Sequence, residues 1–198
     1  MLKAQVSHTK LEAGCDEAGR GCLAGPVTAA AVILPKGFNH EWLNDSKQVN
    51  QKRREELRKV IEEEALYWAV AVCTPEEIDG INILNASIQA MHRAVDALDV
   101  EPSFLAIDGN RFKPYREVQF STEVKGDGRF LNIAAASILA KTHRDEVMLK
   151  LHSEFPQYGW DTNAGYPTIQ HRDAIREFGV TPYHRKTFRL LPEQMKLF

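Results

Sequence analysis

A glycine-rich turn between two strand-like segments limits the fold of this chain more than any other feature. Residues 11–17 have strand character, and residues 27–34 form a second segment rich in β-branched and small residues, as in a buried strand. The turn between them, Ala18-Gly19-Arg20-Gly21, has almost no side-chain bulk around its one arginine. Two acids, Asp16 and Glu17, precede this turn directly. The chain therefore begins with two strands, and the connection between them carries chemically useful groups.

An acid pair beside a bare backbone indicates metal-dependent chemistry on a phosphodiester. Carboxylates hold hard cations through oxygen ligands, and glycines let main-chain N–H groups approach a sugar or phosphate closely. The alternative is a solvated strand end, which such a pair often forms. Regular strand geometry sends Asp16 and Glu17 to opposite faces. Both can serve one metal cluster only if the strand ends or bulges there, and the glycine turn supplies that ending.

The length of 198 residues predicts a single domain, 1–198, in which about residues 189–198 form a tail. No apolar run approaches the roughly 18 residues that span a bilayer, and the first residues lack the apolar core of a signal peptide. We therefore expect a cytoplasmic protein. We also expect a monomer. Cys15, Cys22 and Cys73 have no CxxC spacing, so we expect reduced core residues rather than a disulfide or zinc site.

The rest of the chain mixes strands with helices. The spacing of apolar residues predicts helices over 51–65, 82–98, 131–151 and 168–178, the last of them ended by Gly179. Strands are expected over 66–73, 104–108 and 117–124. The first half of the helix over 131–151 is small and apolar enough to pack tightly against a sheet. These segments indicate an α/β protein.

Two later aspartates stand where a carboxylate can reach the acid pair. Asp108 ends an apolar strand, and α/β proteins place their sites at this carboxyl edge, although a turn-forming aspartate would look the same. Asp127 lies between glycines just before the long helix. Its rival, Asp145, lies about 14 residues along that helix, or roughly 21 Å from its start. The two cannot share one site, and we favour Asp127.

The net charge of −2 does not exclude nucleic acid, because phosphate contacts depend on where cations cluster. Local basic groups occur at His184-Arg185-Lys186, at Lys52-Arg53-Arg54 and at Lys125. A solvated face is the alternative for each, most clearly where Glu55 and Glu56 follow Arg54. His171, on a predicted helix without ligand spacing, is expected in the core or on the surface rather than on a metal.

Seven short runs of the sequence together resemble bacterial ribonuclease HII, and the resemblance extends from about residue 11 to residue 188. They are Asp16-Glu17-Ala18-Gly19-Arg20-Gly21, Asn44-Asp45-Ser46-Lys47, Ile107-Asp108-Gly109, Lys125-Gly126-Asp127, Ala134 to Lys141, Gly165-Tyr166-Pro167-Thr168 and His184-Arg185. The resemblance implies an RNase H-like fold, with a central mixed sheet flanked by helices and a helical C-terminal part. It also implies an endonuclease that hydrolyses the RNA strand of RNA/DNA hybrids and cuts 5′ of ribonucleotides embedded in duplex DNA.

The resemblance also assigns roles to residues. Asp16, Glu17, Asp108 and Asp127 match the family's four metal-site carboxylates, which implies two Mg²⁺ or Mn²⁺ ions and products with a 5′-phosphate and a 3′-hydroxyl. The run Gly19-Arg20-Gly21 matches the loop that reads the ribose 2′-hydroxyl.

Further substrate contacts are implied for Lys47, Tyr166 and Arg185. Tyr166 matches the aromatic that packs on the adjacent deoxyribose, although on residues alone it could be a loop aromatic packed on the core. Many relatives have lysine where this chain has Ala164, which puts one phosphate contact in doubt.

Two other functions compete with this interpretation. A ribonuclease HIII would be expected to have an additional N-terminal substrate-binding domain and no Gly-Arg-Gly run. A non-catalytic hybrid-binding module would have lost one of the acids, and all four are present. The end of the chain, Gln194-Met195-Lys196-Leu197-Phe198, resembles peptides that dock on the replication sliding clamp. Its alternative is a terminus that packs back on its own domain.

Overall fold

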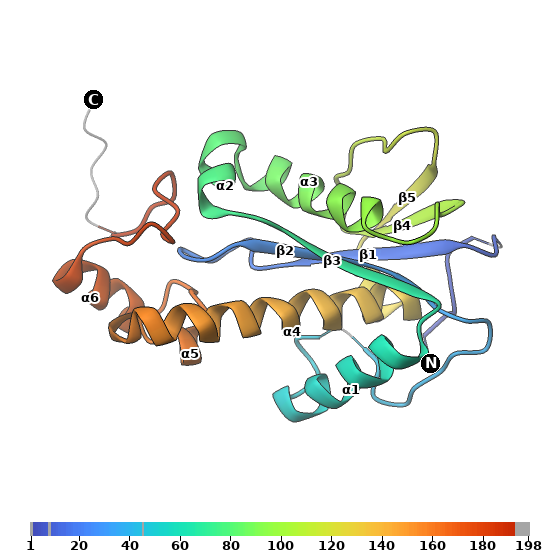
Figure 1. Cartoon of the computed structure of the whole chain (residues 1–198), viewed down its shortest axis with the longest axis horizontal. Helices are drawn as coiled ribbons and strands as arrows, with labels where there is room; N and C mark the ends of the chain where they lie inside the picture. The colour runs from blue at the N-terminus through green and yellow to red at the C-terminus, as the bar shows by residue number, and fades with distance from the viewer. Residues whose placement is uncertain (1, 8, 45, 193–198) are drawn as a thin grey trace.

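A five-stranded mixed sheet forms the centre of the protein in this computed structural model, which describes residues 2–7, 9–44 and 46–192 (Figure 1). The strands lie in the order β3-β2-β1-β4-β5. β1 (Glu12–Ala18), β2 (Val27–Ile33) and β3 (Tyr67–Cys73) are antiparallel neighbours. β4 (Phe104–Asp108) runs parallel to β1, and β5 (Gln119–Glu123) runs parallel to β4. The mixed sheet that the resemblance implied is therefore confirmed.

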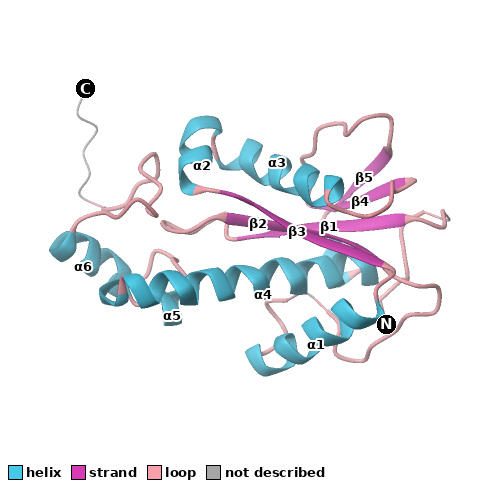
Figure 2. Cartoon of the chain, in the orientation of Figure 1, coloured by secondary structure: helices cyan, strands magenta, loops and turns pink. Residues whose placement is uncertain are grey.

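Helices cover both faces of this sheet (Figure 2). On one face lie α2 (Pro75–Ile81) and α3 (Ile83–Asp96), and on the other lie α1 (Gln51–Glu64) and the long α4 (Leu131–Glu154). The short α5 (Trp160–Asn163) and α6 (Ile169–Phe178) follow at the C-terminal end of α4. Two 3₁₀ turns, η1 (Gly126–Gly128) and η2 (Pro156–Tyr158), precede α4 and α5. The flanking helices and the helical C-terminal part are as expected.

The alternation of side chains along β1 and β2 divides the core into two clusters. Cys15 and Ala29 pack with α3, whereas Ala30 packs with α4 on the opposite face. α4 lies very close to β1, since a Cβ added to Gly14 would lie 2.3 Å from the carbonyl carbon of Asn132. This glycine and the small residues of α4 allow the close packing that the sequence predicted. The contact fixes α4 beside the end of β1 that carries the acids.

Each predicted strand and helix is present, with bounds that differ by a few residues at most. β4 has the predicted bounds, and Gly179, at φ 78°, ends α6. Two short helices, α2 and α5, were not predicted. The three cysteines are free and buried, as expected. In the described part of the chain, no helix is both long enough and apolar enough to cross a membrane.

The segment expected as a tail from residue 189 is anchored at its start. Leu190 is 6% exposed and belongs to a cluster with Tyr158, Trp160 and Ile175. The Arg172 guanidinium donates to the carbonyl oxygen of Leu190. Ordered packing therefore continues beyond Phe188, because Leu190 fills an apolar site next to α6. The proposed clamp-binding residues 194–198 lie outside the described residues.

Candidate active site

Asp16 and Asp108 leave neighbouring parallel strands at the same edge of the sheet. Cys15 is the register partner of Ile107, so the next residue of each strand, Asp16 and Asp108, lies on the face that α4 covers. Asp16 is 5% exposed, and its carboxylate accepts a hydrogen bond from the Ser137 side chain of α4. The sheet and α4 thus hold this acid between them.

Asp127 comes to the same edge on the 3₁₀ turn η1. Asp108 Oδ1 accepts a hydrogen bond of 2.7 Å from the main-chain N–H of Gly126. A Cβ at Gly126 would lie 2.7 Å from Ile133 Cδ1, so the lack of a side chain lets η1 pack closely on α4. Lys125 adopts a left-handed backbone, φ 55°, which turns the chain into η1. Asp127 is itself 5% exposed, and its charge helps to raise the pKa of Asp16.

The rival aspartate lies elsewhere. Asp145 is on α4 and pairs with Lys141 at 2.5 Å, one helical turn away. Its charge is not among those that shift the pKa of Asp16, whereas the charge of Asp127 is. The geometry therefore groups Asp127, and not Asp145, with the acid pair.

Glu17 reaches the site differently from the sequence expectation. β1 does not end between the two acids but continues to Ala18, and Glu17 pairs with Ala29. Because the strand stays regular, Glu17 leaves from the face opposite to Asp16. The charge of Glu17 nevertheless raises the pKa of Asp16, and the charge of Asp108 raises the pKa of Glu17. The strand does end at the glycine turn, but one residue later than predicted, so both acids lie in regular strand and the end of the sheet brings them near one site.

The electrostatics of this acid cluster favour a bound cation. Burial raises the pKa of Asp16 well above its usual range, and the charges of Glu17 and Asp108 raise it further. Burial also raises the pKa of Glu17, which Arg20 and Lys47 partly offset. Glu17 Oε2 is buried without a hydrogen-bond partner among the described residues. Buried, mutually repelling and partly unsatisfied oxygens are what a hard cation satisfies.

The acids are not already arranged as a closed set of ligands. In the described residues, no group of three or more His, Cys, Asp or Glu side chains converges closely enough to hold a metal ion as it stands. The side chains would therefore rotate when they ligate an ion together. The donor set itself, four carboxylates, fits Mg²⁺ or Mn²⁺.

The glycine loop presents its main chain outward at Gly21. A Cβ added to Gly21 would meet nothing within 4 Å, whereas one added to Gly19, at φ 96°, would lie 2.0 Å from Arg144 Nε. Arg20 is exposed, and its guanidinium pairs with Glu17 Oε1 at 3.1 Å. Among the described residues, the main-chain N–H groups of Arg20 and Gly21 have no acceptor. They are available to a ligand.

Tyr166 stands beside this loop. Its side chain is 41% exposed, and its hydroxyl forms a hydrogen bond with the Cys22 side chain. The Tyr166 carbonyl oxygen contacts His171 Nδ1 at 2.9 Å. A ring that is tethered at its hydroxyl and remains partly exposed to solvent is suited to a contact with a ligand rather than to filling the core.

Lys47 and Arg185, both expected to bind substrate, have different surroundings. Lys47 is exposed, and its charge lowers the pKa of Glu17, so it lies beside the acids. Its loop is fastened to α4 by the 2.9 Å hydrogen bond between Ser137 Oγ and Ser46 Oγ. Arg185 is 0% exposed and donates only to main-chain carbonyls, such as that of Gly19. Its expected role as a direct substrate contact was wrong, because burial removes the guanidinium from the surface.

Sequence reasoning did not assign roles to Ser137 and Arg144 of α4. Both side chains are buried, and they lie about two helical turns apart on one side of the helix. Polar residues at helical spacing within an otherwise small and apolar face are the signal that could have identified them. His171, expected in the core or on the surface, is buried at 0% exposure.

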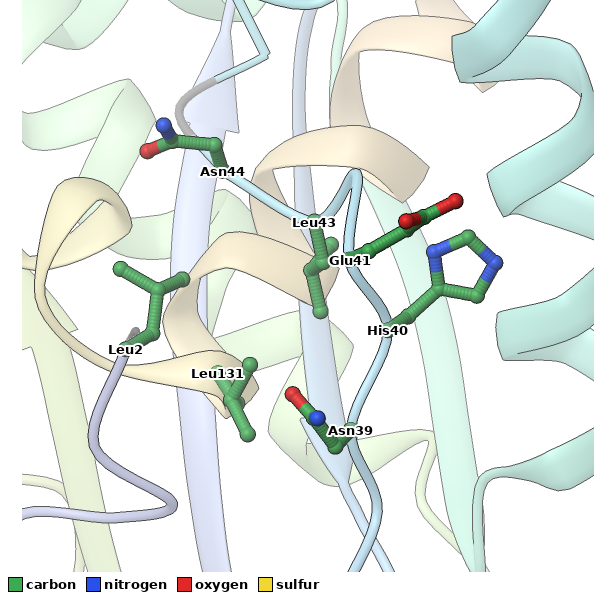
Figure 3. Close-up of a pocket in the computed structure, with 7 residues that line it drawn as sticks. All are labelled: Leu2, Asn39, His40, Glu41, Leu43, Asn44 and Leu131. Carbon is green, nitrogen blue, oxygen red and sulfur yellow. The ribbon is translucent and has the colours of Figure 1, made fainter.

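A pocket lies close to η1 but does not contain the acids (Figure 3). It is lined by Leu2, Asn39, His40, Glu41, Leu43, Asn44 and Leu131. Leu131 opens α4, and Asn44 belongs to the loop that also carries Lys47. The pocket therefore lies between the start of α4 and the loop that carries Lys47, and none of the four acids lines it.

A mixed sheet with acids at the carboxyl ends of β1 and β4, and a long helix packed over them, defines a nuclease of the ribonuclease H-like class. Residues 13–191 match the family model described as Ribonuclease HII. A Ribonuclease HII of Parabacteroides distasonis is 62% identical over 197 residues, which is 100% of this chain and 99% of that protein. The chain belongs to the ribonuclease HII family, whose members are endoribonucleases.

Solved structures agree on the fold. The structure of a PCNA:RNase HII complex from Archaeoglobus fulgidus matches with a TM-score of 0.76 and 25% identity, over 95% of this chain and 100% of that one. Bst-RNase HIII in complex with Mn²⁺ matches with a TM-score of 0.70 and 20% identity, over 91% of this chain and 67% of that one. The similarity to Bst-RNase HIII shows only a shared fold. The family match favours ribonuclease HII over the HIII alternative.

Proposed function

We propose that this member of the family is a metal-dependent endonuclease that hydrolyses the RNA strand of RNA/DNA hybrids and cuts 5′ of single ribonucleotides in duplex DNA. The observation that carries the proposal is the grouping of four carboxylates beside the open main chain of Arg20 and Gly21. Carboxylates supply cation sites, and an open main chain supplies donors for a sugar hydroxyl. The same residues thus provide both the chemistry and the means to distinguish RNA from DNA.

Two Mg²⁺ or Mn²⁺ ions would be held by the four carboxylates, and we assign Asp16 and Asp108 as the candidates to ligate both. When bound, such ions activate a water molecule and stabilise the leaving 3′ oxygen, which yields a 5′-phosphate and a 3′-hydroxyl. The Ser137 hydroxyl keeps the Asp16 carboxylate oriented by donating to it. The Gly126 N–H does the same for Asp108. Each acid is thus preorganised by α4 or by η1.

Recognition of the ribonucleotide is assigned to three neighbouring elements. The main-chain N–H groups of Arg20 and Gly21 can donate to the 2′-hydroxyl, which is the group that tells RNA from DNA. The partly exposed Tyr166 side chain can pack on the next sugar. Lys47, exposed beside the acids, can contact a phosphate. Ala164 stands where the resemblance led us to expect a lysine, so one phosphate contact would be missing from this site.

A cleavage assay tests the proposal. Three matched duplexes are used: one with a single ribonucleotide, one RNA/DNA hybrid and one of DNA alone, each with Mg²⁺, with Mn²⁺ or with EDTA. We expect cleavage of the first two only when a metal is present, with the cut 5′ of the ribonucleotide and a 3′-hydroxyl on the upstream product. Equal cutting of the all-DNA duplex, or cleavage that survives EDTA, would contradict the proposal.

A sliding clamp is the second partner that we propose, through Gln194-Met195-Lys196-Leu197-Phe198. Two observations support it: the apolar Leu197 and Phe198 on a polar terminus, and the archaeal structural neighbour that forms a complex with PCNA. Deleting the last five residues should abolish binding to the bacterial clamp in a pull-down and leave hydrolysis of a short substrate unchanged. Retained clamp binding by the truncated protein would exclude this segment as the docking site.

A further inference from the structure

Two arginine side chains are enclosed beneath the glycine loop of residues 19–26. Arg144 of α4 is 1% exposed, and Arg185, in the segment after α6, is 0% exposed. Their guanidinium groups donate to main-chain carbonyl oxygens at 2.8–3.1 Å. Arg144 donates to Pro26, Ala24 and Ala164, and Arg185 donates to Gly19, Arg20 and Gly25.

This arrangement requires the planar fork of arginine. A buried charge is costly unless hydrogen bonds satisfy it, and neither arginine forms an ion pair with a carboxylate within the part of the chain that the structure describes. Hydrogen bonds to main-chain carbonyl oxygens therefore compensate the two buried guanidinium charges. A lysine ammonium, a compact point charge on a flexible stem, cannot serve carbonyls that are spread across the plane of a guanidinium. The two sites thus select arginine by geometry.

The arginines determine which side of the loop faces solvent. Because the carbonyls of Gly19 and Arg20 point inward to Arg185, the N–H groups of Arg20 and Gly21 are left for an outside acceptor. Gly19 must lack a side chain, since its Cβ would collide with Arg144 Nε. The loop conformation and the two guanidinium groups therefore depend on each other.

The same contacts join the loop to the turn that carries Tyr166. Arg144 donates to Ala164 as well as to the loop, and Leu23 N donates to Gly165 O at 2.8 Å. A Cβ at Gly165 would lie 2.5 Å from Ala24 O, so the two segments are in close contact. The hydrogen bond between Tyr166 and Cys22 adds a side-chain link. The loop and the tyrosine turn form one interlocked unit.

We propose that Arg144 and Arg185 are positioning residues that set the enzyme's specificity for a ribonucleotide, by holding the glycine loop and the Tyr166 turn as one recognition unit. Neither residue touches the substrate. The inference rests on the proposed function, because it concerns how that site reads the 2′-hydroxyl. Its consequence is that specificity depends on two buried residues that a survey of the surface would omit.

Arg144→Lys and Arg185→Lys test the proposal, with Arg58→Lys as the matched control. Arg58 bonds to Glu62 and Glu146, away from the loop. Affinity is measured in EDTA for a duplex with one ribonucleotide and for the same duplex in DNA alone, and kcat/KM is measured with Mn²⁺. We expect the affinity ratio of the two duplexes to fall toward one in both variants and kcat/KM to fall about 100-fold, with DNA-only affinity unchanged. The control should behave as wild type.

Three results would overturn the proposal: an unchanged affinity ratio, an equal loss for both duplexes, or the same effect in Arg58→Lys. A wild-type protein that shows no preference for the ribonucleotide duplex would instead contradict the proposed function. Hydrogen exchange on the wild-type protein gives a second test that needs no variant. The hydrogen-bonded amides of Leu23 and Gly25 in the loop, and of Gly165 and Tyr166 in the turn, should exchange in one cooperative step. Independent exchange of the two segments would show that they are not one unit, whether or not the variants fold.

Discussion

Acidification should destabilise the protein through the buried pair His171 and His184. Trp160 Nε1 donates to His171 Nε2 at 3.0 Å, so the neutral His171 ring carries its proton on Nδ1 and donates to Tyr166 O. Thr181 N donates to His184 Nδ1 at 2.9 Å, so His184 donates from Nε2 to His171 Nε2, at 3.2 Å. This network has no place for an additional proton. Its integrity also fixes the main chain of Tyr166.

The magnitude follows from the pKa of His184, which burial and the neighbouring His171 lower from 6.5 to about 4. The unfolded chain takes up the proton near its ordinary pKa, but the folded chain does so only near 4. Between these values the unfolded state holds more protons, so stability falls as the pH falls. The loss is about 2 kcal/mol between pH 7 and pH 5, and about 3 kcal/mol in full. Above pH 7 both states are neutral at this residue, and no effect remains.

Urea unfolding at pH 7 and pH 5 measures this loss in wild type, in His184→Asn and in His92→Gln. Asn offers an oxygen in place of Nδ1 to Thr181 N and does not titrate, so His184→Asn should lose less stability than wild type by about 2 kcal/mol over this interval. His92, which contacts Lys113 O from α3, controls for the removal of a histidine. The acid cluster changes the unfolding free energy with pH in the opposite direction, but it does so equally in wild type and in both variants, so the difference between the proteins is due to the substituted histidine. If His184→Asn lost as much unfolding free energy as wild type between pH 7 and pH 5, His184 would not be the cause of the loss.

Three further predictions concern the site. Gly21→Ala should fold normally, because its Cβ meets nothing within 4 Å, yet it should weaken cleavage at an embedded ribonucleotide more than it weakens Mn²⁺ binding. Gly19→Ala should also lower the melting temperature, because its Cβ would lie 2.0 Å from Arg144 Nε. Tyr166→Ala should weaken binding of the ribonucleotide duplex by about 1–3 kcal/mol, and wild-type affinity in a filter-binding assay would count against stacking. Asp16→Asn should stabilise the metal-free protein at pH 7 by on the order of 1 kcal/mol. Burial and the neighbouring acids raise the pKa of Asp16, so its negative charge is unfavourable in the folded protein. A lower melting temperature for this variant than for wild type would contradict the prediction.

Local sequence signals predicted most of the sheet and helices because the periodicity of apolar residues was strong. β4 ends at Asp108 and α6 ends at Gly179, where an acid before glycine and a C-terminal glycine mark the boundaries. α2 was missed although its capping box, Thr74 with Glu77, is a start signal. Its short length left too few apolar residues for a periodic pattern. The continuation of β1 to Ala18 also escaped prediction, because its pairing with β2 decides where the strand ends.

The sequence identified the acidic residues of the candidate site better than the residues that hold them. Asp16 and Asp108 stand next to recognisable strand ends, so local pattern sufficed. Arg185 was assigned to the substrate through the resemblance, and neither the resemblance nor its basic neighbours report burial. Arg144 was missed because its partners, from Ala24 to Ala164, are distant in sequence and are main-chain atoms. Hydrogen bonds to carbonyls leave no trace in the identity of the partner residues.

The proposed catalytic site consists of four carboxylates that bind metal ions together. The most direct test compares Asp108→Asn with Asp145→Asn, which carries the same change on the rival aspartate paired with Lys141. Single-turnover cleavage of a duplex with one ribonucleotide is followed over a range of Mn²⁺ concentrations, and Mn²⁺ binding is measured in parallel by electron paramagnetic resonance. We expect Asp108→Asn to keep its fold but to lose nearly all cleavage and to bind Mn²⁺ more weakly, whereas Asp145→Asn should retain both cleavage and Mn²⁺ binding. Wild-type cleavage by Asp108→Asn, or loss of Mn²⁺ binding in Asp145→Asn alone, would contradict the proposed site.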